Sequence, residues 1–187
     1  MNYVKKMIGE KCSLALVDIE DAPQYSAWLS DLEVSMYLTV ASQQLSLERE
    51  SEILTAMCQD GEHVFGIVDQ ANEQLIGNCG LINIDHVHRR ADLGVFIGEK
   101  SYWGMGYGRE AVKLLLDYGF NILNLHSIEL KAVVYNERAI SCYKKCGFKE
   151  SGRRRESWVM GGKAYDQIYM DILASEFESV YVKKLIP

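Results

Sequence analysis

The sequence predicts an α+β fold with a mixed, mostly antiparallel sheet flanked by helices. Strand-like runs outnumber helical patterns along the chain. Most of these runs follow one another across short polar turns, which is typical of antiparallel neighbours. Helical patterns interrupt the strands at two places, so the regular strand–helix alternation of a parallel sheet is missing.

Apolar periodicity and turn residues define the elements in chain order. Alternating or continuous apolar runs between polar turns indicate strands, and apolar residues at i, i+3 and i+4 after a capping residue indicate a helix. The predicted elements are a strand at 14–17, a helix from Asp18 or Asp21 to about Leu29, a helix from Ser46 to about Gln59, strands at 64–69, 75–84 and 91–98, a helix after Gly108, a strand at 128–134, a helix at 137–145 and a hairpin around Gly161 and Gly162.

Composition narrows the class of protein. The 187 residues amount to about one ordinary domain, large enough to bury a core. The net charge of −6 argues against general nucleic-acid binding and suits a cationic partner. No apolar run approaches the ~18 residues of a membrane span, and the first residues lack a signal-peptide core. The five cysteines show no Cys-x-x-Cys spacing, so we expect reduced thiols in a cytoplasmic protein.

A loop with glycine at every second position is the most informative feature of the chain. It reads Trp103-Gly-Met-Gly-Tyr-Gly108, follows the predicted strand at 91–98 and opens directly into a helix. Glycines allow several backbone N–H groups to point into one concavity, and the start of the helix adds its own unpaired N–H groups and the positive end of its dipole. This arrangement is typical of a phosphate site.

The spacing of the glycines separates three kinds of phosphate loop. A nucleoside-triphosphate loop needs Gly-x-x-x-x-Gly-Lys-Ser/Thr, and the sequence has none, because Gly162-Lys163 is followed by Ala164. A dinucleotide loop needs Gly-x-Gly-x-x-Gly, but Arg109 stands where the third glycine would be. The third candidate is the pyrophosphate loop of acetyl-CoA-dependent N-acetyltransferases. Trp103-x-x-Gly106-x-Gly108 resembles that loop, with Trp in place of the usual Gln or Arg.

A second motif lies downstream, beyond one predicted strand. It reads Asn136-Glu-Arg-Ala-Ile-Ser-Cys-Tyr143-Lys-Lys-Cys-Gly147-Phe148. In order and separation, the two motifs resemble the signature of the GNAT N-acetyltransferase superfamily. The segments Leu14–Leu38 and Gly162–Leu173 also resemble the branch that contains ribosomal-protein-alanine and spermidine acetyltransferases. This resemblance implies a single N-acetyltransferase domain over 1–187, with a core at about 12–176.

The resemblance implies where acetyl-CoA, the only cofactor expected, would bind. The sheet is expected to splay between the strands at 91–98 and 128–134, and the pantetheine arm would enter there. The implied cofactor-binding residues lie on the first of these strands, in the glycine loop and at the start of the helix at 137–145; they are Val95, Phe96, Ile97, Trp103, Gly104, Met105, Gly106, Tyr107, Gly108, Arg109, Asn136, Arg138 and Ala139. Asn136 is also suited to cap that helix.

Acetyl transfer to an amine needs a group that protonates the leaving thiolate and a group that accepts the amine proton. Tyr143 is the candidate acid, since a phenol with a pKa of ~10 is protonated at neutral pH. Asp92 lies where relatives often have Glu, and is the candidate base. His86 and His88 would share one strand face, but without further ligands at a recognisable spacing we expect no metal.

The acceptor is less well defined by the sequence. Deprotonating an α-amino group at pH 7 costs about 1 kcal/mol, whereas an alkylamine costs about 5 kcal/mol, so a strong base would favour a polyamine. The segment 102–107 and Arg138-Ala-Ile resemble the ribosomal-protein-alanine group, which is the first prediction. Segments 81–88 and 121–126 resemble spermidine acetyltransferases, the alternative. A non-catalytic acyl-CoA sensor is a third possibility. We expect a small-molecule or peptide amine as partner, no nucleic acid and no membrane; a homo-oligomer is compatible with the sequence.

Overall fold

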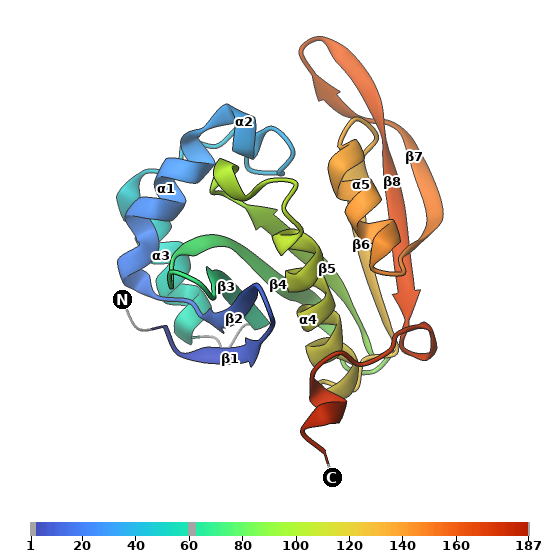
Figure 1. Ribbon diagram of the computed structural model, residues 1–187. Helices are drawn as coiled ribbons and strands as arrows, with labels where there is room; N and C mark the ends of the chain where they lie inside the picture. Colours follow the sequence, from blue (N-terminus) through green and yellow to red (C-terminus); the bar gives the residue numbers. More distant parts are fainter. Residues whose placement is uncertain (1–2, 60–62, 187) are drawn as a thin grey trace.

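A computed structural model describes residues 3–59 and 63–186 and contains one eight-stranded sheet with helices on both faces (Figure 1). The strand order is β1-β2-β3-β4-β5-β6-β8-β7. The strands are β1 (Lys5–Ile8), β2 (Cys12–Leu16), β3 (His63–Asp69), β4 (Leu75–Asp85), β5 (Arg90–Ile97), β6 (Ser127–Val133), β7 (Lys149–Met160) and β8 (Lys163–Leu173). The helices are α1 (Ala22–Ser30), α2 (Leu32–Ser35), α3 (Leu47–Gln59), α4 (Tyr107–Asn121) and α5 (Glu137–Lys145).

Every pair of neighbouring strands is antiparallel except β5 and β6, which are parallel. The α+β prediction, with a mixed and mostly antiparallel sheet, is therefore confirmed. In the described residues, β5 pairs with β6 only from Arg90–Ser127 to Asp92–Glu129, although both strands continue well beyond that point. The sheet thus splays where the family resemblance implied, and Figure 1 shows β5 and β6 diverging.

Two apolar clusters hold the layers together. The larger cluster joins α4 and α5 to one face of the sheet. Its members on α4 include Ala111, Leu114, Leu115 and Tyr118, which are all buried. The smaller cluster joins Trp28 of α1 and Leu54 of α3 to Ala15 and Val68 on the opposite face. Because successive strand residues point to opposite faces, Leu14 and Ala15 enter different clusters.

The hydrophobic core includes residues near both ends of the described chain. Met7 on β1 and Val182 near the C-terminus are 3% and 4% exposed, and both belong to the larger cluster. Strand β1 is short and has a single buried side chain, so its periodicity is too weak to predict it. The C-terminal segment is held by Asp117 of α4, which accepts hydrogen bonds from the backbone N–H groups of residues 180–182.

Candidate active site

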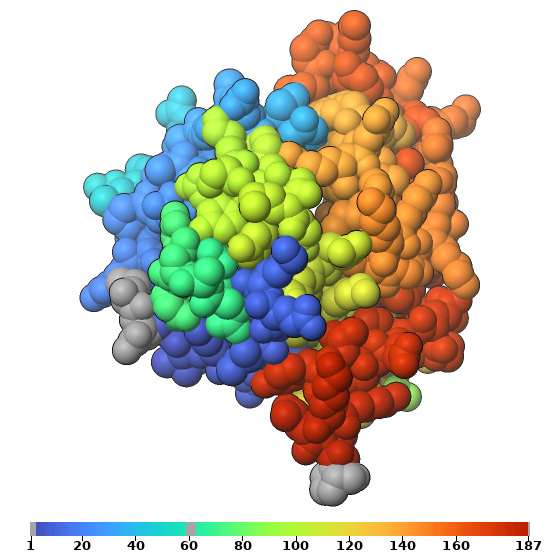
Figure 2. Space-filling model, in the orientation of Figure 1, coloured from blue at the N-terminus to red at the C-terminus, as the bar shows by residue number. Residues whose placement is uncertain are grey.

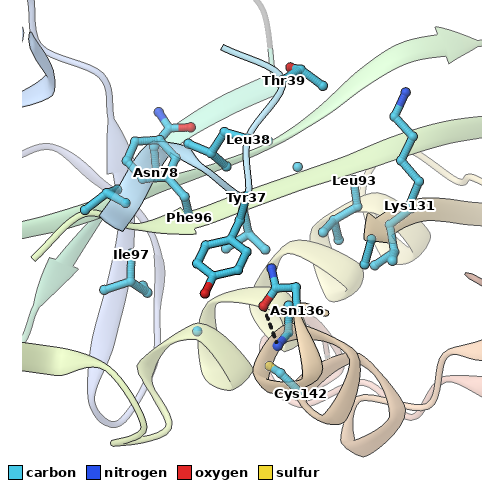
Figure 3. A pocket seen from close by; sticks show the side chains of 18 of the residues that line it. Tyr37, Leu38, Thr39, Asn78, Leu93, Phe96, Ile97, Lys131, Asn136 and Cys142 are labelled. Atoms are coloured by element: carbon cyan, nitrogen blue, oxygen red, sulfur yellow. Dashed lines mark hydrogen bonds between the residues drawn. The ribbon is translucent and has the colours of Figure 1, made fainter. Parts of the chain in front are cut away.

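A cavity of about 990 Å³ opens where β5 and β6 diverge. Its walls come from strands β3 to β8, from α1, α2, α3 and α5, from the segment between α2 and α3, and from the loop before α4. Every predicted cofactor or catalytic residue lines this cavity except Tyr107. Figure 3 shows Tyr37 and Asn136, which lie far apart in the sequence, both turned into it. The structure thus brings together residues that the sequence had placed on separate elements.

The glycine loop forms a cradle with an unobstructed surface. Gly104 and Gly106 have φ of 77° and 91°, a left-handed conformation that side chains with a Cβ rarely adopt. A Cβ built on either residue would meet no protein atom within 4 Å, so the space above the loop is open. Gly106 is the N-cap of α4, so the first N–H groups of that helix, which have no intrahelical partner, begin at this loop. The cradle therefore fits a phosphate group.

Two tyrosines hold the loop from the opposite side. Tyr102 donates a hydrogen bond to Oδ2 of Asp69 at 3.1 Å, and Tyr107 donates to Oδ1 at 3.0 Å. Asp69 is 3% exposed and lies at the end of β3. The side chain of Tyr107 is consequently held at Asp69 and does not line the cavity. Only its backbone N–H, at the start of α4, remains available to a ligand.

A cation–π contact joins the two sides of the splay beside the glycine loop. The Arg138 guanidinium of α5 lies 3.9 Å from the centre of the Trp103 ring. The Trp103 indole in turn donates to the carbonyl oxygen of Ile97 on β5 at 2.7 Å. Figure 2 shows this junction, where the yellow-green loop and the start of α4 meet the orange surface of α5. Trp103 thus acts through stacking, and an anion bound in the cradle would lie close to the Arg138 charge.

The edge of β5 beyond Asp92 offers backbone groups to a ligand. Residues 93–97 have no strand partner on the β6 side within the described chain, so their backbone polar groups on that side are not used by the sheet. Asn136 faces this edge from the start of α5 (Figure 3). Its side-chain oxygen accepts from the N–H of Ala139 at 3.2 Å, which confirms the predicted helix cap. The amide nitrogen makes no hydrogen bond within the described residues and can donate to a ligand.

Tyr143 lies on the cavity wall formed by α5. Its side chain is 9% exposed, and the ring packs edge-on against Phe148 at 6.0 Å between centroids. The hydroxyl makes no hydrogen bond to any described residue. Burial raises the pKa of the Tyr143 phenol above its ordinary value, so the hydroxyl keeps its proton well into the alkaline range. The group is therefore suited to donate a proton.

Asp92 has a carboxylate neighbour that sequence analysis missed. Asp92 and Glu129 are directly paired across β5 and β6, at the last pair before the strands separate. Partial burial raises the pKa of the Glu129 carboxyl, and the charge of Asp92 raises it further. Asn83 donates to Oδ2 of Asp92 at 2.8 Å and orients it. In the sequence, Glu129 stands between the apolar residues Ile128 and Leu130, which are both buried. This alternation indicates that Glu129 faces away from the α4 side of the sheet.

Aromatic side chains from the segment after α2 and from β7 line part of the cavity. Trp158 of β7 donates to the Tyr135 hydroxyl at 2.9 Å, and that hydroxyl donates to the carbonyl oxygen of Met36 at 3.3 Å. The Tyr37 and Tyr135 rings are 5.8 Å apart. These contacts connect the segment after α2 to the far side of the splay. Sequence analysis missed them because they join residues 23 to 99 positions apart, on elements that only the folded chain brings together.

The two histidines considered for a metal do not share a strand face. His86 and His88 lie in the turn between β4 and β5, and both are exposed. The turn forms because Asp85 accepts hydrogen bonds from the N–H groups of Val87 and His88. Among residues 3–59 and 63–186, no group of three or more His, Cys, Asp or Glu side chains is arranged to hold a metal ion.

The chain belongs to the GNAT acetyltransferase family, because the model of the acetyltransferase (GNAT) domain matches residues 13–149. It is a GNAT N-acetyltransferase. A solved structure of spermidine N-acetyltransferase from Vibrio cholerae, in complex with CoA and spermine, superposes with a TM-score of 0.81 at 29% sequence identity. The superposition covers 90% of this chain and 98% of that one. CoA therefore binds in a protein of this fold.

Sequence relatives favour the polyamine alternative over the ribosomal-protein-alanine prediction. Spermidine N(1)-acetyltransferase of Vibrio cholerae is 34% identical over 132 residues, which are 71% of this chain and 76% of the relative. The putative ribosomal N-acetyltransferase YdaF of Bacillus subtilis is 33% identical over 103 residues, which are 54% of this chain and 56% of the relative. At similar identity, the likeness to the spermidine enzyme therefore extends over more of the chain.

In the part of the chain that the structure describes, no helix has the length and apolar character needed to cross a membrane.

Proposed function

We propose that the protein transfers the acetyl group of acetyl-CoA to a primary amine of a polyamine. The observation that carries this proposal is the likeness, over nine-tenths of the chain, to a spermidine N-acetyltransferase whose structure contains spermine. The side chains that line the cavity suit a polyamine acceptor. Asp92 and Glu129 supply negative charge, and Tyr37 and Trp158 supply aromatic surface for methylene groups and ammonium groups.

The residues around the glycine loop fit the cofactor. Backbone N–H groups of residues 104–108 and the Arg138 guanidinium would hold the pyrophosphate. The open edge of β5 at residues 93–97 and the Asn136 amide would bind the pantetheine amides, much as an added strand pairs with a sheet edge. When bound, acetyl-CoA supplies the acetyl group as a thioester. The protein's part is to align that group with the amine and to move two protons.

The first proton is the one carried by the incoming ammonium. An alkylamine has a pKa near ~10.4, so at pH 7 its deprotonation costs about 5 kcal/mol. Asp92 and Glu129 lie side by side where the sheet opens. The raised pKa of the Glu129 carboxyl brings its proton affinity closer to that of the amine, so the pair accepts the proton more readily than a solvated carboxylate would.

The second proton goes to the sulfur that leaves the acetyl group. Tyr143 lies on the same cavity wall as Asn136 and keeps its proton at neutral pH, so it would donate to the developing thiolate. No covalent acyl-enzyme is needed, because the amine attacks the thioester directly. The carboxylate pair and the phenol thus divide the base and acid roles between β5–β6 and α5.

Thiol release from acetyl-CoA, followed with several amines, tests the proposal. The panel contains spermidine, spermine, a basic peptide that begins with alanine, and buffer alone. We expect turnover with spermidine or spermine, and a kcat/KM for the peptide at least about tenfold lower, a difference of 1.4 kcal/mol. Turnover confined to the peptide would restore the ribosomal-protein-alanine acceptor. If acetyl-CoA fails to raise the melting temperature, the cofactor assignment is wrong.

A further inference from the structure

A buried carboxylate on the cavity wall has no role in the chemistry described above. Glu50 lies in the first turn of α3 and is 3% exposed. Its Oε2 atom makes no hydrogen bond to any residue in 3–59 or 63–186, and no ion pair to Glu50 occurs there. The side chain lines the same cavity as Asp92 and Glu129.

An unpartnered carboxyl group is unfavourable in this position. Burial disfavours the charged form of Glu50, and no neighbouring cation offsets that effect, so its pKa is raised. The surrounding wall includes the apolar side chains of Leu45, Leu54 and Val64. A leucine or methionine at position 50 would suit these neighbours without leaving a polar atom unsatisfied. Stability therefore does not explain the glutamate, whereas a cationic ligand in the cavity would.

We propose that Glu50 binds the distal ammonium group of an acceptor whose reacting amine lies at Asp92 and Glu129. The acceptor would therefore carry at least two amino groups joined by methylene groups. This inference rests on the proposed function and deepens it, since it names the residue that holds the second ammonium group of the acceptor. The cavity lining also includes Tyr25, Leu29 and Met57, whose aromatic and apolar surfaces suit a methylene chain.

A series of linear α,ω-diamines and the monoamines of the same length tests this role in the full-length protein. Glu50→Gln keeps the shape of the side chain and removes its charge. For the unmodified protein we expect kcat/KM to favour the diamine over its monoamine at one chain length. In Glu50→Gln we expect that preference to fall at least about tenfold, because the variant loses one hydrogen bond between charged groups. Glu52→Gln is the matched control, because Glu52 is on the same helix but exposed and outside the cavity.

The outcomes separate this inference from the proposed function. An unchanged diamine preference in Glu50→Gln, with spermidine still acetylated by both proteins, overturns the role of Glu50 alone. Absence of turnover with every polyamine and diamine in the unmodified protein overturns the proposed function and this inference with it. Glu50→Leu is the second variant, in case Gln disturbs the fold. We expect it to unfold at the same or a higher temperature than the unmodified protein and to lose the same preference.

Discussion

Tyr143 combines a fixed position with a hydroxyl that no described residue uses. Its ring is held against Phe148, so Tyr143→Phe removes the hydroxyl and leaves the packing intact. General acids contribute typically about 10²–10⁴-fold to rate, and we expect kcat to fall by about that factor. The rise in melting temperature that acetyl-CoA produces should persist, as a control on binding. A kcat within twofold of the unmodified protein would remove Tyr143 from the acid role.

Asp92 and Glu129 act on each other because like charges lie side by side. The Asp92 charge disfavours the ionised form of Glu129, so Asp92→Asn should move the pKa of Glu129 down toward the ordinary Glu value of about 4.3. The proton-accepting form of Glu129 would then persist to lower pH. A ¹³C NMR titration of the Glu129 carboxyl measures this shift, with Glu137→Gln, an exposed change on α5, as control. An unmoved titration would mean that the two carboxyls are not coupled.

Among individual residues, sequence analysis was most successful for those within one motif. Asn136 and Tyr143 lie on the same helix, so their spacing alone places both on the wall of the cavity. Glu129, Tyr37 and Glu50 were missed, because they reach the cavity from elements that only the folded chain brings together. Tyr107 stays a predicted cofactor contact through its backbone N–H in the loop. The loop motif does not specify the direction of its side chain, which Asp69 sets from β3.

The junction of the glycine loop with α4 is an element whose geometry depends on glycine. Gly106 has φ of 91°, so Gly106→Ala should cost about 1–2 kcal/mol of stability through backbone strain. The added methyl group would also enter the open space that we assign to phosphate, and the KM for acetyl-CoA should rise. Urea unfolding and acetyl-CoA saturation curves measure the two effects. Gly152→Ala is the control, since Gly152 has no positive φ and no atom within 4 Å of the added Cβ. Equal effects of the two variants would contradict the cradle.

Among the elements, those with local boundary signals were predicted best. Helix α5 matches its predicted range of 137–145, because Asn136 caps its start and Gly147, with φ of 102°, ends it. The hairpin turn at Gly161 and Gly162 likewise has positive φ at both residues. Strand β1 and the four-residue helix α2 were not predicted. Their few residues carry too little periodicity, and contacts with β2 and α1 stabilise them.

At the scale of the whole molecule, Asp117 connects the C-terminal segment to α4. It is fully buried and also accepts hydrogen bonds from the side chains of Ser179 and Asn121. Asp117→Asn would turn an NH₂ donor toward backbone N–H donors, so we expect a loss of about 3 kcal/mol or more. Urea unfolding measures it, with Glu178→Gln, an exposed change in the same segment, as control. A loss below about 1 kcal/mol would mean that the segment docks without this anchor.

By itself, the sequence determined the fold class, the glycine loop and the downstream motif, because each depends on backbone conformation and side-chain spacing within one short segment. It therefore determined the family and the wall to which we assign the cofactor. Tertiary structure decided the parallel contact of β5 with β6, the pairing of Asp92 with Glu129 and the position of Glu50 in the same cavity. These features join residues whose separation along the chain carries no signal, since they meet only when burial of the two apolar clusters brings their strands and helices together.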